Sequence, residues 1–122
     1  MAFLTAWRLN APTRMGAVWA TLLPTALTRI LASQDPSGGY LFTRLDNQCG
    51  YNKPFMVGLL NDAFIKYYTH FQADPRIPGA VQRSVDYMWA RDWRATARAF
   101  VYLGGPCPGH DEGQAPSPDL NN

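Results

Sequence analysis

Two stretches of the chain repeat apolar residues at spacings of three and four, the period of an amphipathic helix. The first begins at Pro54, and proline is well suited to the first turn of a helix. Its apolar positions are Phe55, Met56, Leu59, Leu60, Ala63, Phe64, Tyr67 and Phe71. The second follows a turn over residues 72–78, in which Asp74 is a good N-cap. Its apolar positions are Ile77, Val81, Val85, Met88 and Trp89. The short connection predicts an antiparallel helical hairpin over residues 54–93.

An earlier stretch, residues 15–31, has the same spacing and is interrupted by Pro24. Either the helix kinks at this proline or a second helix begins there. The segment SQDPSGG, residues 33–39, then ends the helical pattern. The chain is therefore predicted to be mainly α-helical, with short β segments near 40–45 and 99–103.

The domain organisation follows from the same pattern. Residues 1–103 are expected to form a single helical domain or a domain fragment. Residues 104–122 are rich in glycine and proline and contain almost nothing apolar. Such a segment cannot bury enough surface to order itself, so it is expected to be a disordered tail or a connection to another part of the protein.

Charge and composition narrow the classes of partner. The net charge is +2 and the eleven Lys and Arg residues are scattered, so nothing indicates a nucleic-acid partner. No apolar run reaches the length of a membrane span. Charged residues make up only 16% of the chain, which suggests that part of its surface meets another chain or another part of a larger protein. Cys49 and Cys107 are too far apart for a CxxC site, and whether they pair stays open.

The order of these elements resembles one repeat of the (α/α) toroid proteins, the six-hairpin group of glycoside hydrolases and polysaccharide lyases. The resemblance rests on a polar loop, an inner helix that begins with proline, an Asp-Pro-Arg turn at residues 74–76 and an outer helix ending near a tryptophan. It is greatest to uncharacterised bacterial proteins of that type, which favours a secreted or periplasmic location. A toroid needs about six hairpins, and this chain has room for two at most. The resemblance therefore implies an incomplete toroid: a fragment, a truncated product, or a protomer completed by association.

In toroid proteins the ligand cleft lies at the N-terminal ends of the inner helices, so the resemblance places a substrate site at the loop before Pro54. Free N–H groups at a helix N-terminus suit carboxylates or sugar hydroxyls. Trp93 is added because exposed tryptophans stack on sugar rings, whereas Trp89 fits the apolar stripe and is expected in the core. The alternative for the loop is a solvated connection with turn-forming residues. The candidate substrate-binding residues are Asp46, Asn47, Gln48, Tyr51, Asn52, Lys53 and Trp93.

Catalytic chemistry is not fixed by the sequence. A glycosidase needs two carboxyl groups about 5–10 Å apart, and Asp46 is the only carboxylate in the candidate loop. A lyase would need a base such as Tyr51 or Lys53. His110-Asp111-Glu112 has no second cluster of ligands beside it, so neither a metal nor a cofactor is expected.

Three functions stay open at this point. The chain is a fragment or subunit of a carbohydrate-active toroid protein that binds or processes a polysaccharide. Alternatively, it is a non-catalytic helical interaction or scaffold module, or an isolated fragment without activity of its own. The partners implied are a polysaccharide, a second copy of the chain, or the missing hairpins.

Overall fold

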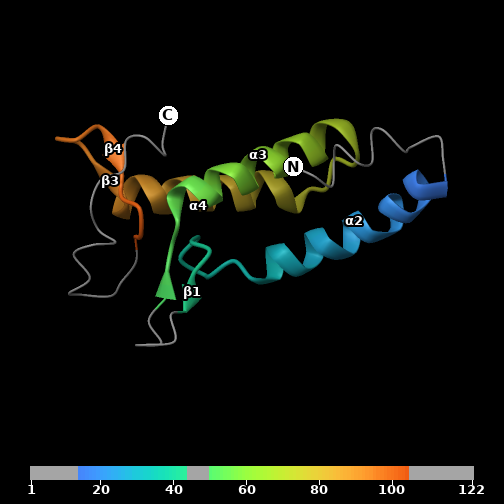
Figure 1. Cartoon of the computed structure of the whole chain (residues 1–122), viewed down its shortest axis with the longest axis horizontal. Helices are drawn as coiled ribbons and strands as arrows, with labels where there is room; N and C mark the ends of the chain where they lie inside the picture. Colours follow the sequence, from blue (N-terminus) through green and yellow to red (C-terminus); the bar gives the residue numbers. More distant parts are fainter. Residues whose placement is uncertain (1–13, 44–49, 105–122) are drawn as a thin grey trace.

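The structure is a computed structural model of the chain, and it describes residues 14–43 and 50–104. Three helices and four two-residue strands are present in these residues. The mainly α-helical fold with short β segments is confirmed. Helices α3 and α4 run side by side, α2 lies against them, and the strands gather at the end of the hairpin where α3 begins and α4 ends (Figure 1).

Helix α2 spans Arg14–Ala32 as one continuous helix with Pro24 inside it. Of the two alternatives at this proline, the structure therefore excludes a second helix that begins there. Leu23 and Leu27 are buried, whereas Val18 and Leu22 are exposed. The buried pair packs with Phe64, Tyr67 and Ile77, so α2 closes the main core over the hairpin.

The predicted hairpin consists of α3, Pro54–His70, and α4, Arg76–Arg91. Asp74 was expected to be the N-cap of α4, but the helix begins one residue later, so that Pro75 is its N-cap. Asp74 still accepts a hydrogen bond from the Arg76 backbone N–H at 2.9 Å, and its carboxylate pairs with the Arg76 guanidinium at 2.8 Å. This pairing lowers the pKa of Asp74 to about 2, so the carboxylate is ionised and fixes the turn near neutral pH.

The buried face of α3 is displaced from the predicted stripe. Its buried residues are Pro54, Val57, Asn61, Phe64 and Tyr67. Met56 and Leu59, both placed in the stripe by spacing, are 52% and 58% exposed. Because α3 carries apolar residues on several sides, spacing alone does not select the side that packs against α4.

A polar pair joins the two helices inside the hairpin. Asn61 donates from Nδ2 to the Ser84 hydroxyl at 2.9 Å, and both side chains are buried. Ser84 Oγ also lies 2.9 Å from the Val81 carbonyl oxygen and 3.1 Å from Asn61 Oδ1, and its single proton can go to either acceptor. Nothing in the sequence around Asn61 predicts that it is buried, because amide side chains are usually exposed.

The turn after α2 is attached to the middle of α4. Gln34 donates from Nε2 to the Ala80 carbonyl oxygen at 3.0 Å and accepts from Arg83 at 3.0 Å. Gly38 has a φ of 105° and lies so close to the Arg83 carbonyl that a Cβ atom would overlap it. These contacts determine where the chain emerges from the turn at Tyr40.

The strands form two antiparallel ribbons. Strand β1, Phe42–Thr43, pairs with β2, Gly50–Tyr51, and β3, Trp93–Arg94, pairs with β4, Ala99–Phe100. β1 and β4 fall within the predicted extended segments, whereas β2 and β3 fall where a loop and a turn were expected. A bridge between Asn52, directly after β2, and Gly104, a few residues after β4, links the two ribbons.

Candidate functional site

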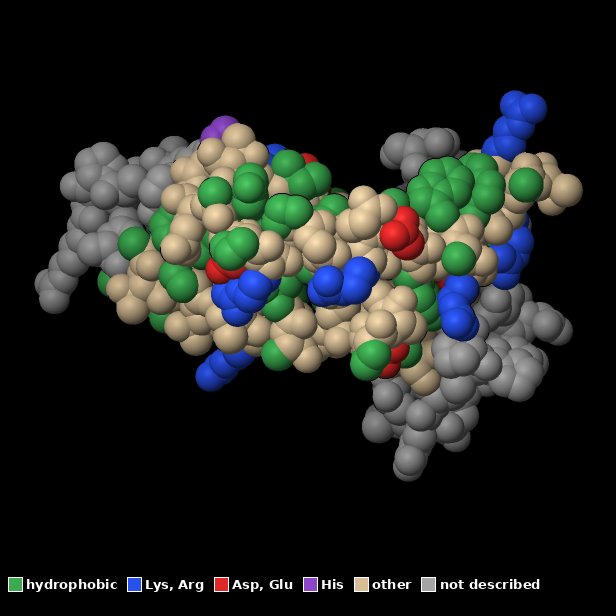
Figure 2. Space-filling model, turned by 180° about the vertical axis from the view of Figure 1, so that it is seen from behind, with side chains coloured by type: hydrophobic (Ala, Val, Ile, Leu, Met, Phe, Trp, Pro, Cys, Tyr) green, Lys and Arg blue, Asp and Glu red, His purple; other side chains and the backbone are tan. Residues whose placement is uncertain are grey.

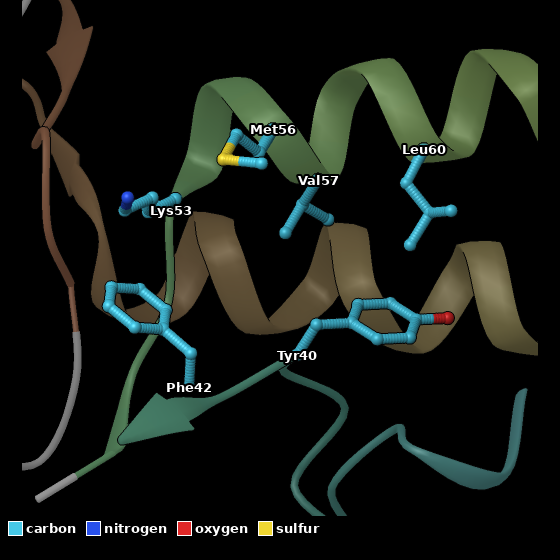
Figure 3. Close-up of a pocket in the computed structure, with 6 residues that line it drawn as sticks. All are labelled: Tyr40, Phe42, Lys53, Met56, Val57 and Leu60. Atoms are coloured by element: carbon cyan, nitrogen blue, oxygen red, sulfur yellow. The ribbon is translucent and has the colours of Figure 1, made fainter. Parts of the chain in front are cut away.

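An open pocket of about 270 Å³ lies between the first two turns of α3 and the segment that enters β1. Figure 3 shows the ring of Tyr40 facing Val57 and Leu60, and the ring of Phe42 lying across the space from Lys53 and Met56. Its lining is almost entirely apolar or aromatic apart from one ammonium group. The residues that line it are Tyr40, Phe42, Lys53, Met56, Val57 and Leu60.

Lys53 is the cation of this pocket. Its Nζ lies 4.7 Å from the centroid of the Phe42 ring, within the range of a cation–π contact. Phe42 in turn packs against Tyr51, with ring centroids 5.9 Å apart. The ammonium group is thus held beside an aromatic face, which gives the pocket a cation and a flat apolar surface close together.

The N-terminal end of α3 adds to the positive character of the pocket. Lys53 is the N-cap residue, and within residues 14–43 and 50–104 no side chain caps the first turn of the helix. Pro54 has no N–H group, and the Val57 N–H donates to the Lys53 carbonyl at 3.0 Å. The remaining first-turn N–H groups belong to Phe55 and Met56, where the helix dipole favours an anion.

A buried polar pair lies directly behind the pocket. Asn52 donates from Nδ2 to Asp92 Oδ2 at 2.8 Å, and neither residue is exposed. Asn52 Oδ1 accepts from the Tyr40 backbone N–H at 3.2 Å. Asn52 is therefore bonded to the backbone of one pocket residue, Tyr40, and is joined by a peptide bond to another, Lys53.

Asp92 is unusual for a buried carboxyl group because only one of its oxygens is paired. Among the described residues, Oδ1 has no hydrogen-bond partner. Burial raises the pKa of Asp92 to about 6, although the hydrogen bond from Asn52 and the charges of Arg94 and Arg91 act in the opposite direction. Desolvation exceeds these favourable interactions because an ionised oxygen without a donor is costly in the interior.

The structure describes four of the seven predicted substrate-binding residues, and it does not bring all four to the pocket. Tyr51 and Asn52 are fully buried, and Lys53 lines the pocket. Trp93 is partly buried in β3 and is not among the residues that line the pocket. The other three, Asp46, Asn47 and Gln48, lie outside the described residues. The same is true of both cysteines and of the His110-Asp111-Glu112 segment.

Trp93 belongs to an aromatic cluster at the end of the molecule. Its ring centroid lies 4.7 Å from that of Trp89 and 5.0 Å from that of Phe100. Trp89 was expected in the core, and this expectation was wrong because the residue is 53% exposed. The core position next to it is filled by Met88, and the Trp89 ring lies against Phe100 of β4, with ring centroids 5.2 Å apart.

Of the six residues that line the pocket, sequence reasoning predicted Lys53 and missed the other five, among which Tyr40 and Phe42 lie outside α3. Both lie in the segment predicted to be extended, and no pattern in the sequence distinguishes them from other aromatic residues. The signal would have been their alternation, since residues two apart in an extended segment lie on the same face. Their place opposite Lys53 follows from the β1–β2 register, in which Phe42 pairs with Tyr51.

No protein-family model, curated protein or solved structure matches the chain. In the part of the chain that the structure describes, no three His, Cys, Asp or Glu side chains are grouped to hold a metal ion. None of the described helices has both the length and the apolar character needed to cross a membrane.

Proposed function

We propose that the chain is a helical ligand-binding module, and that its pocket binds an acidic sugar unit of a polysaccharide. The observation that carries this proposal is the position of the Lys53 ammonium group beside the exposed Phe42 ring at the uncapped end of α3. A uronic acid presents the two matching features, a carboxylate and a ring with apolar C–H faces. The module would be one part of a carbohydrate-active protein of the (α/α) toroid type.

The chemistry of the pocket supports binding rather than catalysis. The nearest described side chains are apolar, aromatic or cationic, and none of the described residues that line the pocket carries a carboxylate. Elsewhere in the described residues, Asp62 pairs with Lys66 at 2.9 Å and Asp74 pairs with Arg76. A general acid and base for sugar chemistry would have to come from other parts of a complete protein.

Binding of a hexuronic-acid oligosaccharide by the full chain, measured by calorimetry, tests this proposal. Lys53→Ala is expected to weaken binding about tenfold or more, because a charge-assisted hydrogen bond contributes about 1.5–3 kcal/mol. Lys66→Ala is the matched control, since it removes the same charge from α3 at a half-exposed position outside the pocket. A neutral oligosaccharide of equal length should bind more weakly than the acidic one.

Equal losses from the two lysine substitutions would show that the binding is diffuse attraction between opposite charges. Absence of binding by the unsubstituted chain would contradict the proposal outright. Retained binding by Lys53→Ala, with loss in Phe42→Ala, would move the ligand to the aromatic side of the pocket and remove the role of the cation.

The exposed side of α3 favours a second function, that of an interaction module. Leu59 and Ile65 are 58% and 53% exposed, and they lie about 120° apart around α3, the more apolar helix of the hairpin. Figure 2, which views the molecule from behind, shows several separate groups of hydrophobic side chains among polar ones, the largest of them toward the end that carries β3 and β4. We infer that another helical hairpin packs over the exposed surface of α3 that carries Leu59 and Ile65, and that a second copy of the chain supplies it in the isolated protein.

A further inference from the structure

We propose that Asn52 and Asp92 form a proton-sensitive latch that positions both walls of the pocket, and that the latch is closed most firmly when Asp92 is protonated. The latch consists of these two side chains and of three contacts made by the same residues. The Tyr40 N–H bonds to the Asn52 side chain, Gly104 bonds to the Asn52 backbone, and the Val101 N–H bonds to the Asp92 backbone carbonyl. Its geometry stands without any ligand, whereas its effect on sugar binding rests on the proposed function.

The latch connects the pocket to the far end of the hairpin. Asn52 bonds to the Tyr40 backbone through one side-chain atom and to Asp92 through the other. Asp92 lies directly after α4, and its backbone carbonyl accepts from the Val101 N–H at 2.9 Å. Loss of the Asn52–Asp92 hydrogen bond would therefore release Tyr40 and the backbone before Lys53 together.

The Asp92 carboxyl group is also closely packed against Gly104. Gly104 bonds to the Asn52 backbone, and its Cα lies against Asp92 so that a Cβ atom would overlap Oδ1. Water is thereby kept from the oxygen that has no partner among the described residues. Among the described residues, the carboxylate of an ionised Asp92 accepts one hydrogen bond, from Asn52 Nδ2. Opening the latch would hydrate the carboxylate.

The charged and titratable groups around Asp92 come from each element that packs against it. Tyr87 and Arg91 are on α4, Arg94 is on β3, and Asn52 is the uncharged partner after β2. The two arginines favour the ionised carboxyl group, and burial opposes it more strongly. Arg91 is also engaged over the Tyr87 ring, 5.3 Å from its centroid.

The direction of the pH effect follows from these interactions. In the closed latch the pKa of Asp92 is about 6, above the ordinary value of 3.8 that the group has when exposed to water. At a pH between these two pKa values, Asp92 is therefore mostly protonated in the closed state and mostly ionised in the open state. The stability of the closed state relative to the open state is greatest below about pH 4, falls as the pH rises toward 6, and levels off above it.

The test follows the carboxyl carbon of Asp92 and the backbone amides of Tyr40, Lys53 and Val101 by NMR between pH 4 and pH 7.5, without ligand. We expect one common midpoint near 6 for all four signals. After correction for intrinsic exchange rates, hydrogen exchange at the Val101 amide should accelerate up to about a hundredfold across the same range.

Asp92→Asn supplies a permanently neutral side chain that keeps an acceptor for Asn52, so it should abolish the pH dependence of all three amides. Asp86→Asn is the matched control, because Asp86 is an exposed carboxylate on the same helix, bonded to Gln82, and its loss should leave the midpoint unchanged. If Asp92→Asn does not fold, the titration of the unsubstituted chain still decides the matter.

Titration of Asp92 near pH 4, or amide signals at Tyr40 and Lys53 that do not follow its midpoint, would overturn the latch. Because no sugar is present, these outcomes are independent of the proposed ligand. A latch confirmed in this way in a chain that binds no acidic oligosaccharide would leave the conformational device intact and refute only the proposed function.

Discussion

Gly104 lies in crowded surroundings, where an added methyl group would overlap Asp92. Its backbone forms a two-way hydrogen-bonded bridge with Asn52, and its Cα faces the buried carboxyl group of Asp92. Glycine is needed here because of this close approach, and its permissive backbone angles play no part.

Gly104→Ala is expected to destabilise the fold by several kcal/mol, because the added methyl group overlaps Asp92 and neither partner has space to move. Chemical denaturation followed by circular dichroism measures the change. Gly58→Ala is the control, since a Cβ atom at Gly58 meets nothing within 4 Å and alanine favours the helix. Equal stabilities for the two variants would contradict the packing described around Asp92.

Lys53 shows what the sequence could predict at this scale, and Asn52 shows what it could not. A cation before a helix that begins with proline is visible in the sequence, and it does line the pocket. Asn52 was assigned to the same candidate site, but it is buried because its partner Asp92 lies 40 positions away in the chain. No local pattern brings these two residues together.

The hairpin of α3 and α4 is the element that the sequence predicted best. Apolar periodicity and the Asp-Pro turn identified both helices and their antiparallel arrangement, because these signals are local. The side of α3 that faces α4 was not predictable from spacing, since the helix carries apolar residues on several sides. The strands β2 and β3 were missed because each has two residues and pairs across a turn or loop.

The Asn61–Ser84 contact gives a test of the hairpin itself. Ser84→Ala is expected to cost about 1–3 kcal/mol of unfolding free energy, because it leaves the buried Asn61 amide without its hydroxyl partner. Replacing both partners, as in Asn61→Leu with Ser84→Ala, should recover most of this loss, since two apolar groups need no partner.

Urea denaturation of the two single variants and the double variant measures the coupling between these residues. Ser33→Ala serves as the control because its hydroxyl donates to the Ile30 carbonyl at an exposed position. Additive effects in the double variant would show that α3 and α4 do not meet through this pair.

At the scale of the whole molecule, the main feature is that α3 exposes large apolar side chains that no other part of the described chain covers. Helix α4 is amphipathic, and Trp89 near its end is its one large exposed apolar side chain among the described residues, whereas α3 exposes several, including Leu59 and Ile65. The low share of charged residues in the chain, 16%, agrees with a surface that is covered in the assembled protein. The toroid arrangement inferred from the sequence would cover it with further hairpins, and it stays a prediction.

Self-association is the outcome expected for the isolated chain. Sedimentation equilibrium should show a concentration-dependent dimer, and Leu59→Gln with Ile65→Gln should shift it toward monomer by removing apolar area from the contact. Val18→Gln with Leu22→Gln, on the exposed side of α2, is the matched pair of substitutions. A chain that stays monomeric at high concentration, or equal effects from both pairs, would count against α3 as the interface.

The proposed function depends most directly on the pocket between α3 and β1 as the place where a ligand binds. An NMR titration of the full chain with a hexuronic-acid oligosaccharide tests it by mapping amide shifts onto the structure. The largest shifts are predicted at Tyr40, Phe42, Lys53 and Met56, with smaller ones at Val57 and Leu60. Shifts confined to the cluster of Trp89, Trp93 and Phe100, or no shifts at all, would contradict it.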